Sequence, residues 1–72
     1  MQQPHPTIEA TVVAELPQQL FRLESKEGPI IAGRSEDATR QGMLIRTGQR
    51  VRVKRARLDP GRGVIISVAE PG

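Results

Sequence analysis

Residues 8–16 read Ile-Glu-Ala-Thr-Val-Val-Ala-Glu-Leu, and apolar side chains recur there at nearly every second position. This period is typical of a half-buried β-strand. The predicted apolar face holds Ile8, Ala10, Val12, Ala14 and Leu16. Pro17 then ends the strand, because proline donates no hydrogen bond to a sheet ladder. The chain is therefore expected to begin as a β-protein.

The same alternation predicts a second strand over residues 20–25. Phe21 and Leu23 fall on one face, which is the expected core face, and Arg22 falls on the outer face. Residues 26–29, Lys-Glu-Gly-Pro, follow as a turn, because glycine accepts a positive φ angle and proline restricts the residue before it.

A short third strand is predicted over residues 30–34. A helix of about two turns is expected to follow, with Ser35 as its N-cap, the carboxylates of residues 36–37 in its first turn, and Gly42 at its end. Such a short helix is stable only when it packs against other structure. Thr47-Gly48 then predicts another turn.

The fourth strand is predicted to begin near residue 49 and to contain Arg50-Val51-Arg52-Val53-Lys54-Arg55-Ala56-Arg57, called the basic stripe below. Strict alternation along it would bury two arginines, Arg55 and Arg57. We therefore expect a bulge at Lys54-Arg55, which would reset the parity and turn Ala56 and Leu58 inward.

In Leu58-Asp59-Pro60-Gly61, proline and glycine are predicted to take the second and third positions of a type II turn. Residues 64–68 are predicted to form a last strand, apolar on both faces and hence covered on both. Three strands, one short helix and two further strands is the element order of an OB-fold. The predicted class is all-β: a small five-stranded OB-fold barrel with the helix between strands 3 and 4. Residues 8–68 would form this domain, between a flexible N-terminal tail (1–7) and a C-terminal tail (69–72).

The charge is unevenly distributed along the chain. Residues 1–36 carry three cations and five anions, whereas residues 37–72 carry eight cations and three anions. A concentrated basic surface favours a polyanion partner, although charge on a sheet edge also prevents strand pairing between molecules. Arginine outnumbers lysine nine to two. Because guanidinium groups bind phosphates bidentately, this ratio favours nucleic acid over simple edge protection.

Other classes of protein are disfavoured by the composition. The chain has no cysteine and one histidine, His5, which stands between prolines, so we expect no enzyme activity, no metal site and no cofactor. No apolar run approaches the length of a membrane span, and no signal peptide is recognisable at the start. We expect a monomeric cytoplasmic protein that does not bind membranes.

Four stretches carry a resemblance to a known family. They are residues 9–17, residues 21–24, Ile45 with residues 48–53, and Asp59 with residues 62–65. In order and spacing they resemble bacterial translation initiation factor 1, without a gap, from about Ile8 to Ile66. The resemblance implies an OB-fold protein that binds the small ribosomal subunit in the A-site region; related factors act as RNA chaperones and affect transcription termination.

The chain departs from this family at two places. Basic and aromatic groups that meet ribosomal RNA in the family are replaced by residues 36–39, Glu-Asp-Ala-Thr, and 41–44, Gln-Gly-Met-Leu. Conversely, the fourth strand is more basic than is usual in the family. The resemblance implies RNA contacts for Arg22, Arg40 and Arg62, while the basic stripe is predicted from composition and alternation alone.

Two functions are consistent with these observations. The first is an RNA-binding protein that binds small-subunit ribosomal RNA near the A site during initiation, with possible contacts to other structured RNA, initiation factors or ribosomal proteins. Its predicted RNA-binding residues are Arg22, Arg40, Arg50, Arg52, Lys54, Arg55, Arg57 and Arg62. The alternative is an OB-fold RNA chaperone or a transcription-associated module that binds an acidic protein. Because Phe21 is the only aromatic residue and is expected in the core, structured RNA is favoured over isolated single strands.

Overall fold

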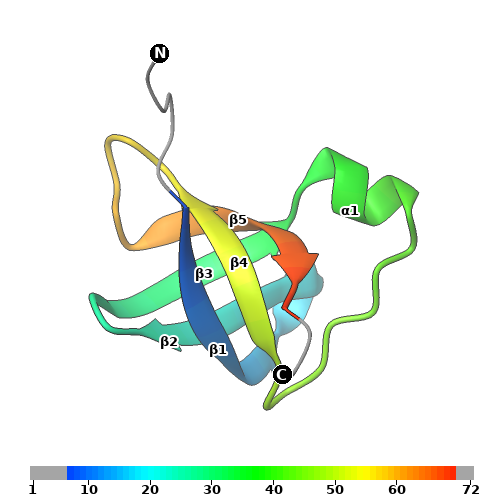
Figure 1. Cartoon of the computed structure of the whole chain (residues 1–72), viewed down its shortest axis with the longest axis horizontal. Helices are drawn as coiled ribbons and strands as arrows, with labels where there is room; N and C mark the ends of the chain where they lie inside the picture. The colour runs from blue at the N-terminus through cyan, green and yellow to red at the C-terminus, as the bar shows by residue number, and fades with distance from the viewer. Residues whose placement is uncertain (1–6, 70–72) are drawn as a thin grey trace.

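Strand β1 (Thr7–Leu16) is long enough to pair with two neighbours, which closes the sheet into a barrel (Figure 1). Its first half runs antiparallel to β4 and its second half antiparallel to β2. In this computed structural model, which describes residues 7–69, the strand order is β1-β2-β3-β5-β4. The other elements are η1 (Pro17–Gln19), β2 (Leu20–Ser25), β3 (Gly28–Arg34), α1 (Glu36–Arg40), β4 (Arg50–Arg55) and β5 (Arg62–Val68).

This architecture confirms the predicted all-β class. Five strands form the barrel, the helix stands between the third and fourth strands, and β3 and β5 pair in parallel. The inner face is apolar and almost fully buried, as the alternation of β2 and β4 predicts. The core residues are Ala10, Val12, Phe21, Leu23, Ile30, Ala32, Ile45, Val51, Val53 and Ile65.

The prediction for β1 is wrong in its second half. The register shifts between Val12, opposite Leu23, and Ala14, opposite Arg22, so Val13 is an extra residue in a bulge. Because residues directly opposite one another share a face, Ala14 and then Leu16 lie on the outer face with Arg22, not with Val12. The alternation of side chains therefore changes sides at Val13.

The predicted bulge at Lys54-Arg55 is also wrong. Pairing of β4 with β1 is regular over residues 50–54, and the strand ends at Arg55, so Ala56 and Leu58 lie in an exposed loop. Arg55 keeps the inward parity of Val51 and Val53. It is the last residue of the strand, its guanidinium pairs with the Glu27 carboxylate, and its side chain is 25% exposed.

The last hairpin differs from the prediction in two ways. Gly61 has no positive φ angle, which excludes a type II turn. The Arg62 amide donates to the Asp59 carbonyl (2.9 Å) and the Gly61 amide to the Asp59 carboxylate (3.2 Å), as an aspartate in the first position of a type I turn allows. In β5, Ile66 is an extra residue relative to β4, and Val64 is 37% exposed, so this strand is not covered on both faces.

The helix starts where the sequence predicts. The Ser35 hydroxyl accepts a hydrogen bond from the Ala38 amide (3.1 Å), and Gly42 takes a φ angle of 67° after the last turn. The helix has five residues, fewer than two turns. Arg34 holds the segment that follows: its Nε donates to the Met43 carbonyl (3.0 Å), and its guanidinium lies 5.6 Å from the centre of the Phe21 ring.

The ends of the chain are only partly described. Residues 1–6 and 70–72, which include His5 and most of both predicted tails, lie outside the described residues. Thr7, assigned to the tail by its sequence, begins β1. Within residues 7–69, no helix has the length and hydropathy needed to cross a membrane.

Candidate nucleic-acid interface

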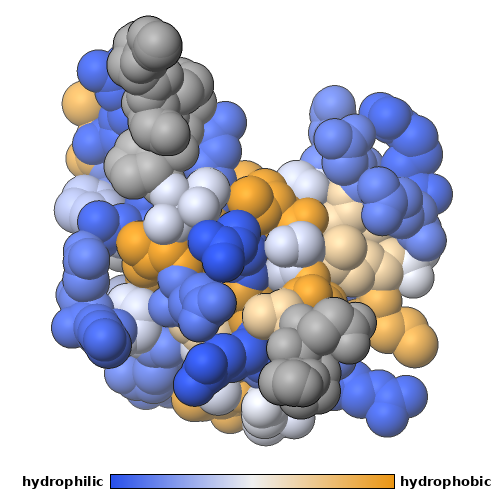
Figure 2. Space-filling model, viewed as in Figure 1, coloured by the Kyte–Doolittle hydropathy of each residue, from blue (hydrophilic) through white to orange (hydrophobic). Residues whose placement is uncertain are grey.

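The first half of the basic stripe forms the outer face of β4. Arg50, Arg52 and Lys54 alternate there with the buried Val51 and Val53. In the view of Figure 2, hydrophilic side chains cover much of the surface over β1 and β4, and others cover α1. This half of the stripe is solvent-facing, as the sequence predicts.

The carboxylate of Glu9 in β1 forms ion pairs with two of these cations, Arg50 and Arg52. Glu9 lies directly opposite Arg52, and its two carboxylate oxygens are 3.5 Å from Arg50 Nη1 and 3.5 Å from Arg52 Nη2. Arg52 Nη1 also donates to the Thr7 hydroxyl (3.3 Å). These pairs are exposed and contribute little to stability, about 0.2–1 kcal/mol each. They nevertheless place a competing anion beside both guanidinium groups.

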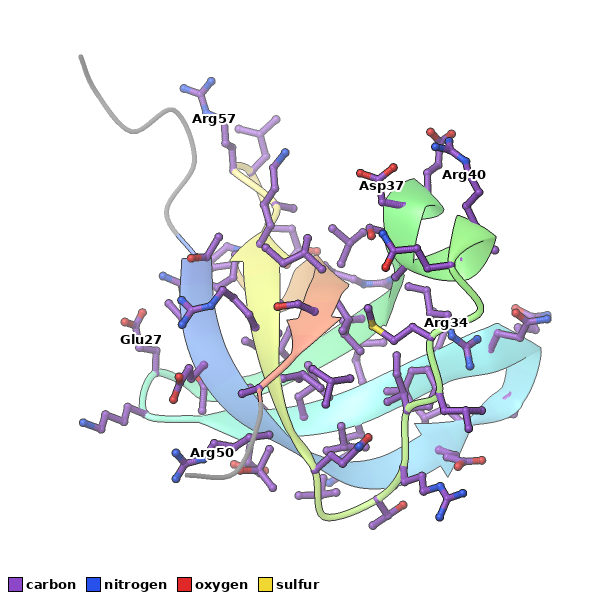
Figure 3. The ribbon with its side chains drawn as sticks, turned by 45° about the vertical axis from the view of Figure 1, so that its right-hand side comes forward. Glu27, Arg34, Asp37, Arg40, Arg50 and Arg57 are labelled. Carbon is purple, nitrogen blue, oxygen red and sulfur yellow. The ribbon has the colours of Figure 1, made fainter. Side chains whose placement is uncertain are left out.

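Two more predicted site residues have carboxylate partners. Arg55 Nη2 lies 2.7 Å from Glu27, which projects from the β2–β3 turn (Figure 3). Arg40 lies 3.3 Å from Asp37 on the exposed side of α1, and Figure 3 shows both pointing away from the barrel. The α1 region therefore offers little uncompensated positive charge.

The remaining four predicted residues have no such partner. Within residues 7–69, no carboxylate oxygen lies within 4.0 Å of the cationic groups of Arg22, Lys54, Arg57 and Arg62. Arg57 projects from the loop beyond β4, at the opposite end of that strand from Arg50 (Figure 3). We call Lys54, Arg57 and Arg62 the hairpin end, since all three lie where β4 meets β5.

Strand register places Arg22, Arg62 and Lys54 on one surface. Arg22 of β2 lies opposite Ile31 of β3, and Ile31 lies opposite Arg62 of β5. These three side chains therefore form one row across the outer face. Neighbouring strands are about 4.8 Å apart, so the backbones that carry the two arginines are separated by about 10 Å.

A second row runs parallel to the first. Gly33 of β3 lies opposite Val64 of β5, which lies opposite Lys54 of β4. Leu20 approaches the position that a Gly33 side chain would occupy. The two rows enclose an open hollow of about 320 Å³ with an apolar floor and a cationic rim, called the outer hollow. Its lining residues are Leu20, Ile31, Gly33, Lys54, Arg55, Ala56, Arg62, Gly63 and Val64.

The sequence predicts the cations of this surface but not its shape. The outward orientation of Arg22 follows from the parity of Phe21 and Leu23, and it is confirmed. The outer hollow needs the parallel pairing of β3 with β5, which no local pattern indicates. An apolar Val64 and a small Gly33 on an outward face are the only traces of it in the sequence.

Within residues 7–69, no cluster of three or more His, Cys, Asp or Glu side chains has the arrangement of a metal site. The loop between β4 and β5 exposes Leu58 almost completely (98%), next to Arg57. The outer surface of the described residues thus carries cations with apolar groups between them.

Comparison with known proteins agrees with the fold. No family pattern matches the chain, and no curated protein matches its sequence. Among solved structures, translation initiation factor 1 from the Wolbachia endosymbiont of Brugia malayi is similar, with a TM-score of 0.75 and 29% identity over 90% of this chain and 78% of that one. The similarity to initiation factor 1 that the sequence predicts is therefore confirmed at the level of structure.

A second solved structure, YjeQ from Thermotoga maritima, superposes with a TM-score of 0.71 and 22% identity over 90% of this chain. The match covers 23% of YjeQ, so the similarity is to one part of YjeQ. At this identity the similarity concerns the fold alone.

Proposed function

We propose that this chain is an RNA-binding translation factor that, like initiation factor 1, binds small-subunit ribosomal RNA near the A site during initiation. The observation that carries the proposal is the row formed by Arg22, Ile31 and Arg62, with Lys54 in the neighbouring row and Arg57 in the loop beyond β4. These four cations are free of carboxylate partners among residues 7–69. The structural similarity to an initiation factor supports the choice of RNA.

The mechanism is binding without a chemical reaction. Each guanidinium or ammonium group that meets a phosphate releases condensed counterions, which provides most of the affinity and little sequence preference. Arginine adds bidentate geometry, which fixes the orientation of the protein on the RNA backbone. A folded RNA presents phosphates in fixed positions, so a rigid barrel face selects it by shape.

This interface differs from the one expected for the family and from the continuous basic stripe. Glu36 and Asp37 give α1 an acidic first turn, and Arg40 is paired with Asp37. Arg50 and Arg52 share Glu9. RNA contact is therefore proposed for the outer face of β2, β3 and β5 together with the hairpin end, and no role in catalysis is proposed for any residue.

The salt dependence of binding tests the proposal. The chain is titrated against a fragment of small-subunit ribosomal RNA between about 50 and 200 mM salt. Four phosphate contacts predict that the logarithm of the affinity falls with the logarithm of salt with a slope of roughly −3, at about 0.7 per contact. Affinity that does not change with salt would contradict the proposal.

A competition experiment separates the proposal from the protein-binding alternative. Small-subunit RNA should displace the chain from an acidic polypeptide of equal net charge, because a folded RNA holds its phosphates in fixed positions, whereas the carboxylates of a flexible polypeptide must be ordered on binding. If the acidic polypeptide is the tighter ligand, the barrel is a protein-interaction module.

A further inference from the structure

The outer hollow carries more apolar surface than phosphate binding needs. Leu20, Ile31 and Val64 line it on the outside of the barrel, and Val64 is 37% exposed. The buried core does not include these side chains. The only aromatic residue, Phe21, belongs to that core, so the hollow has no ring on which a base could stack. An aliphatic floor of this kind suits the aliphatic side chains of a protein.

Gly33 leaves a gap in this floor, called the notch below. It lies opposite Val64, and a Cβ atom there would meet Leu20 Cδ2 at 3.5 Å and the Gln19 carbonyl oxygen at 3.8 Å, which is ordinary van der Waals contact. The backbone at Gly33 has no positive φ angle. Neither backbone conformation nor crowding thus requires glycine here, and the missing side chain leaves room for one from a partner.

Two cations stand beside the notch at a defined spacing. Arg22 of β2 and Arg62 of β5 lie in the row next to that of Gly33, and their backbones are about 10 Å apart. The two rows are about 7 Å apart, because they are two residues apart along each strand. Gly33 is on β3, which lies between β2 and β5. The notch is therefore midway between the two arginines and to one side of them.

An α-helix repeats this spacing along one side. Seven residues rise about 10.5 Å, so side chains at positions i and i+7 match the distance between Arg22 and Arg62. The side chain at i+4 projects from the same side, close to midway between them along the axis. A helix that crosses β2, β3 and β5, with carboxylates at i and i+7 and a leucine at i+4, therefore pairs with both arginines and fills the notch.

We infer that the outer hollow docks an acidic amphipathic helix of a partner protein, with a leucine of that helix in the notch at Gly33. The charges are complementary, because Arg22 and Arg62 have no carboxylate partner within residues 7–69. The helix comes from another protein, since α1, with five residues, is the one α-helix in that range. This partner is additional to the RNA of the proposed function, and both ligands contact Arg22 and Arg62.

The test uses two alanine-based helical peptides of about 15 residues with the same composition. The matched peptide has glutamates at i and i+7 and a leucine at i+4. In the second peptide the leucine is moved to i+2, on the opposite side of the helix. The unsubstituted chain should bind the matched peptide about tenfold more tightly in fluorescence anisotropy titrations, because the leucine is buried in that complex alone.

Two double variants test the ion pairs. Arg22→Gln with Arg62→Gln should weaken binding of the matched peptide about tenfold, because both charge-assisted contacts are lost. Arg50→Gln with Arg52→Gln is the matched control, since it removes the same charge from arginines that pair with Glu9. This control should change the affinity by less than about twofold, because exposed charges at a distance are screened by salt.

A variant at Gly33 tests the notch. Gly33→Val fills it without removing a cation and should make the two peptides bind equally. Val64→Ser is the second variant, in case Gly33→Val disturbs folding, and it should also remove the preference because it makes the floor polar. Val13→Ser should keep the preference, since Val13 is exposed and lines no part of the hollow.

Three results would overturn the inference. They are equal binding of the two peptides by the unsubstituted chain, a preference that survives in folded Gly33→Val and Val64→Ser, and equal losses in the two double arginine variants, which would mean that the peptide binds by overall charge. All three leave salt-dependent RNA binding untouched. If RNA binding fails while the matched peptide keeps its preference, the proposed function is wrong and the inference stands.

Discussion

The two ends of β4 have the same kind of side chain but different surroundings. At one end Arg50 and Arg52 lie across from Glu9, and both approach its carboxylate. At the hairpin end, Lys54, Arg57 and Arg62 have no carboxylate partner within residues 7–69. The comparison teaches that strand register, and not the number of cations, decides which part of a basic segment is available to a polyanion.

Neutralising each end separately gives the largest expected difference. Arg57→Gln with Arg62→Gln should weaken binding to small-subunit RNA on the order of 100-fold, because two charge-assisted contacts of about 1.5 kcal/mol each are lost. Arg50→Gln with Arg52→Gln removes the same charge and should cost less than about threefold. Equilibrium titrations at a fixed salt concentration measure both. Equal losses would show that the stripe binds as one surface.

The position of the hairpin end depends on a close approach between strands. A Cβ at Gly63 would lie 2.6 Å from the Lys54 carbonyl oxygen and 3.1 Å from Val53 Cγ1. Gly63→Ala should therefore lower the free energy of unfolding by about 2–3 kcal/mol, as overpacking does. Urea denaturation measures this change.

Gly33→Ala is the matched control for this substitution, since the nearest atom to its Cβ would be 3.5 Å away. Its free energy of unfolding should stay within about 0.5 kcal/mol of the unsubstituted chain. If the two alanine variants are equally stable, the contact between Gly63 and β4 is not a constraint on the hairpin.

A third comparison contrasts the hairpin end with α1. Ser35→Ala removes the hydroxyl that accepts from the Ala38 amide, which should cost about 1 kcal/mol of stability in thermal or urea unfolding. RNA affinity should stay within twofold, because α1 is not part of the proposed interface. Ser35→Thr retains a capping hydroxyl and should restore most of the stability. A large loss of affinity in Ser35→Ala would bring α1 into the interface.

The smallest effect is expected from making the two ends of β4 alike. Glu9→Gln frees Arg50 and Arg52 while keeping the shape of the side chain, and RNA affinity should rise about threefold with a steeper salt dependence. Glu24→Gln removes the same charge on the outer side of β2 without releasing an arginine, since Glu24 pairs with no cation in residues 7–69. An equal rise in both variants would indicate a general charge effect.

Much of the fold could be predicted because local patterns determine it. The alternation of Phe21 and Leu23, the cap at Ser35 and the positive φ angles of Gly28 and Gly48 all agree with their sequence signals. The bulges could not be placed, because an extra residue is defined only relative to a partner strand. The sequence predicts a bulge at Lys54-Arg55 because strict alternation would bury arginines, whereas in the structure β4 simply ends at Arg55.

The site was predictable to a smaller extent for the same reason. That Arg22 faces outward follows from its neighbours in the chain. The approach of Glu9 to Arg52 joins residues 43 positions apart, and the outer hollow joins β2, β3, β5 and β4. These side chains are brought together by the order in which the strands pair in the barrel. One sequence signal for the Glu9 contact is that Glu9 and the arginines of the basic stripe both face outward, on two strands that a closed barrel must bring together.

The closure of the barrel has a consequence for how the chain folds. Residues 7–11 pair with residues 50–54, and β3 cannot complete its pairing until β5 is present. A topology dominated by such distant pairings has a high contact order, so folding requires long loops to close before most contacts can form. We expect one slow cooperative folding transition in which the two outer rows appear only with the complete barrel, and fragments that end before β5 should remain unfolded.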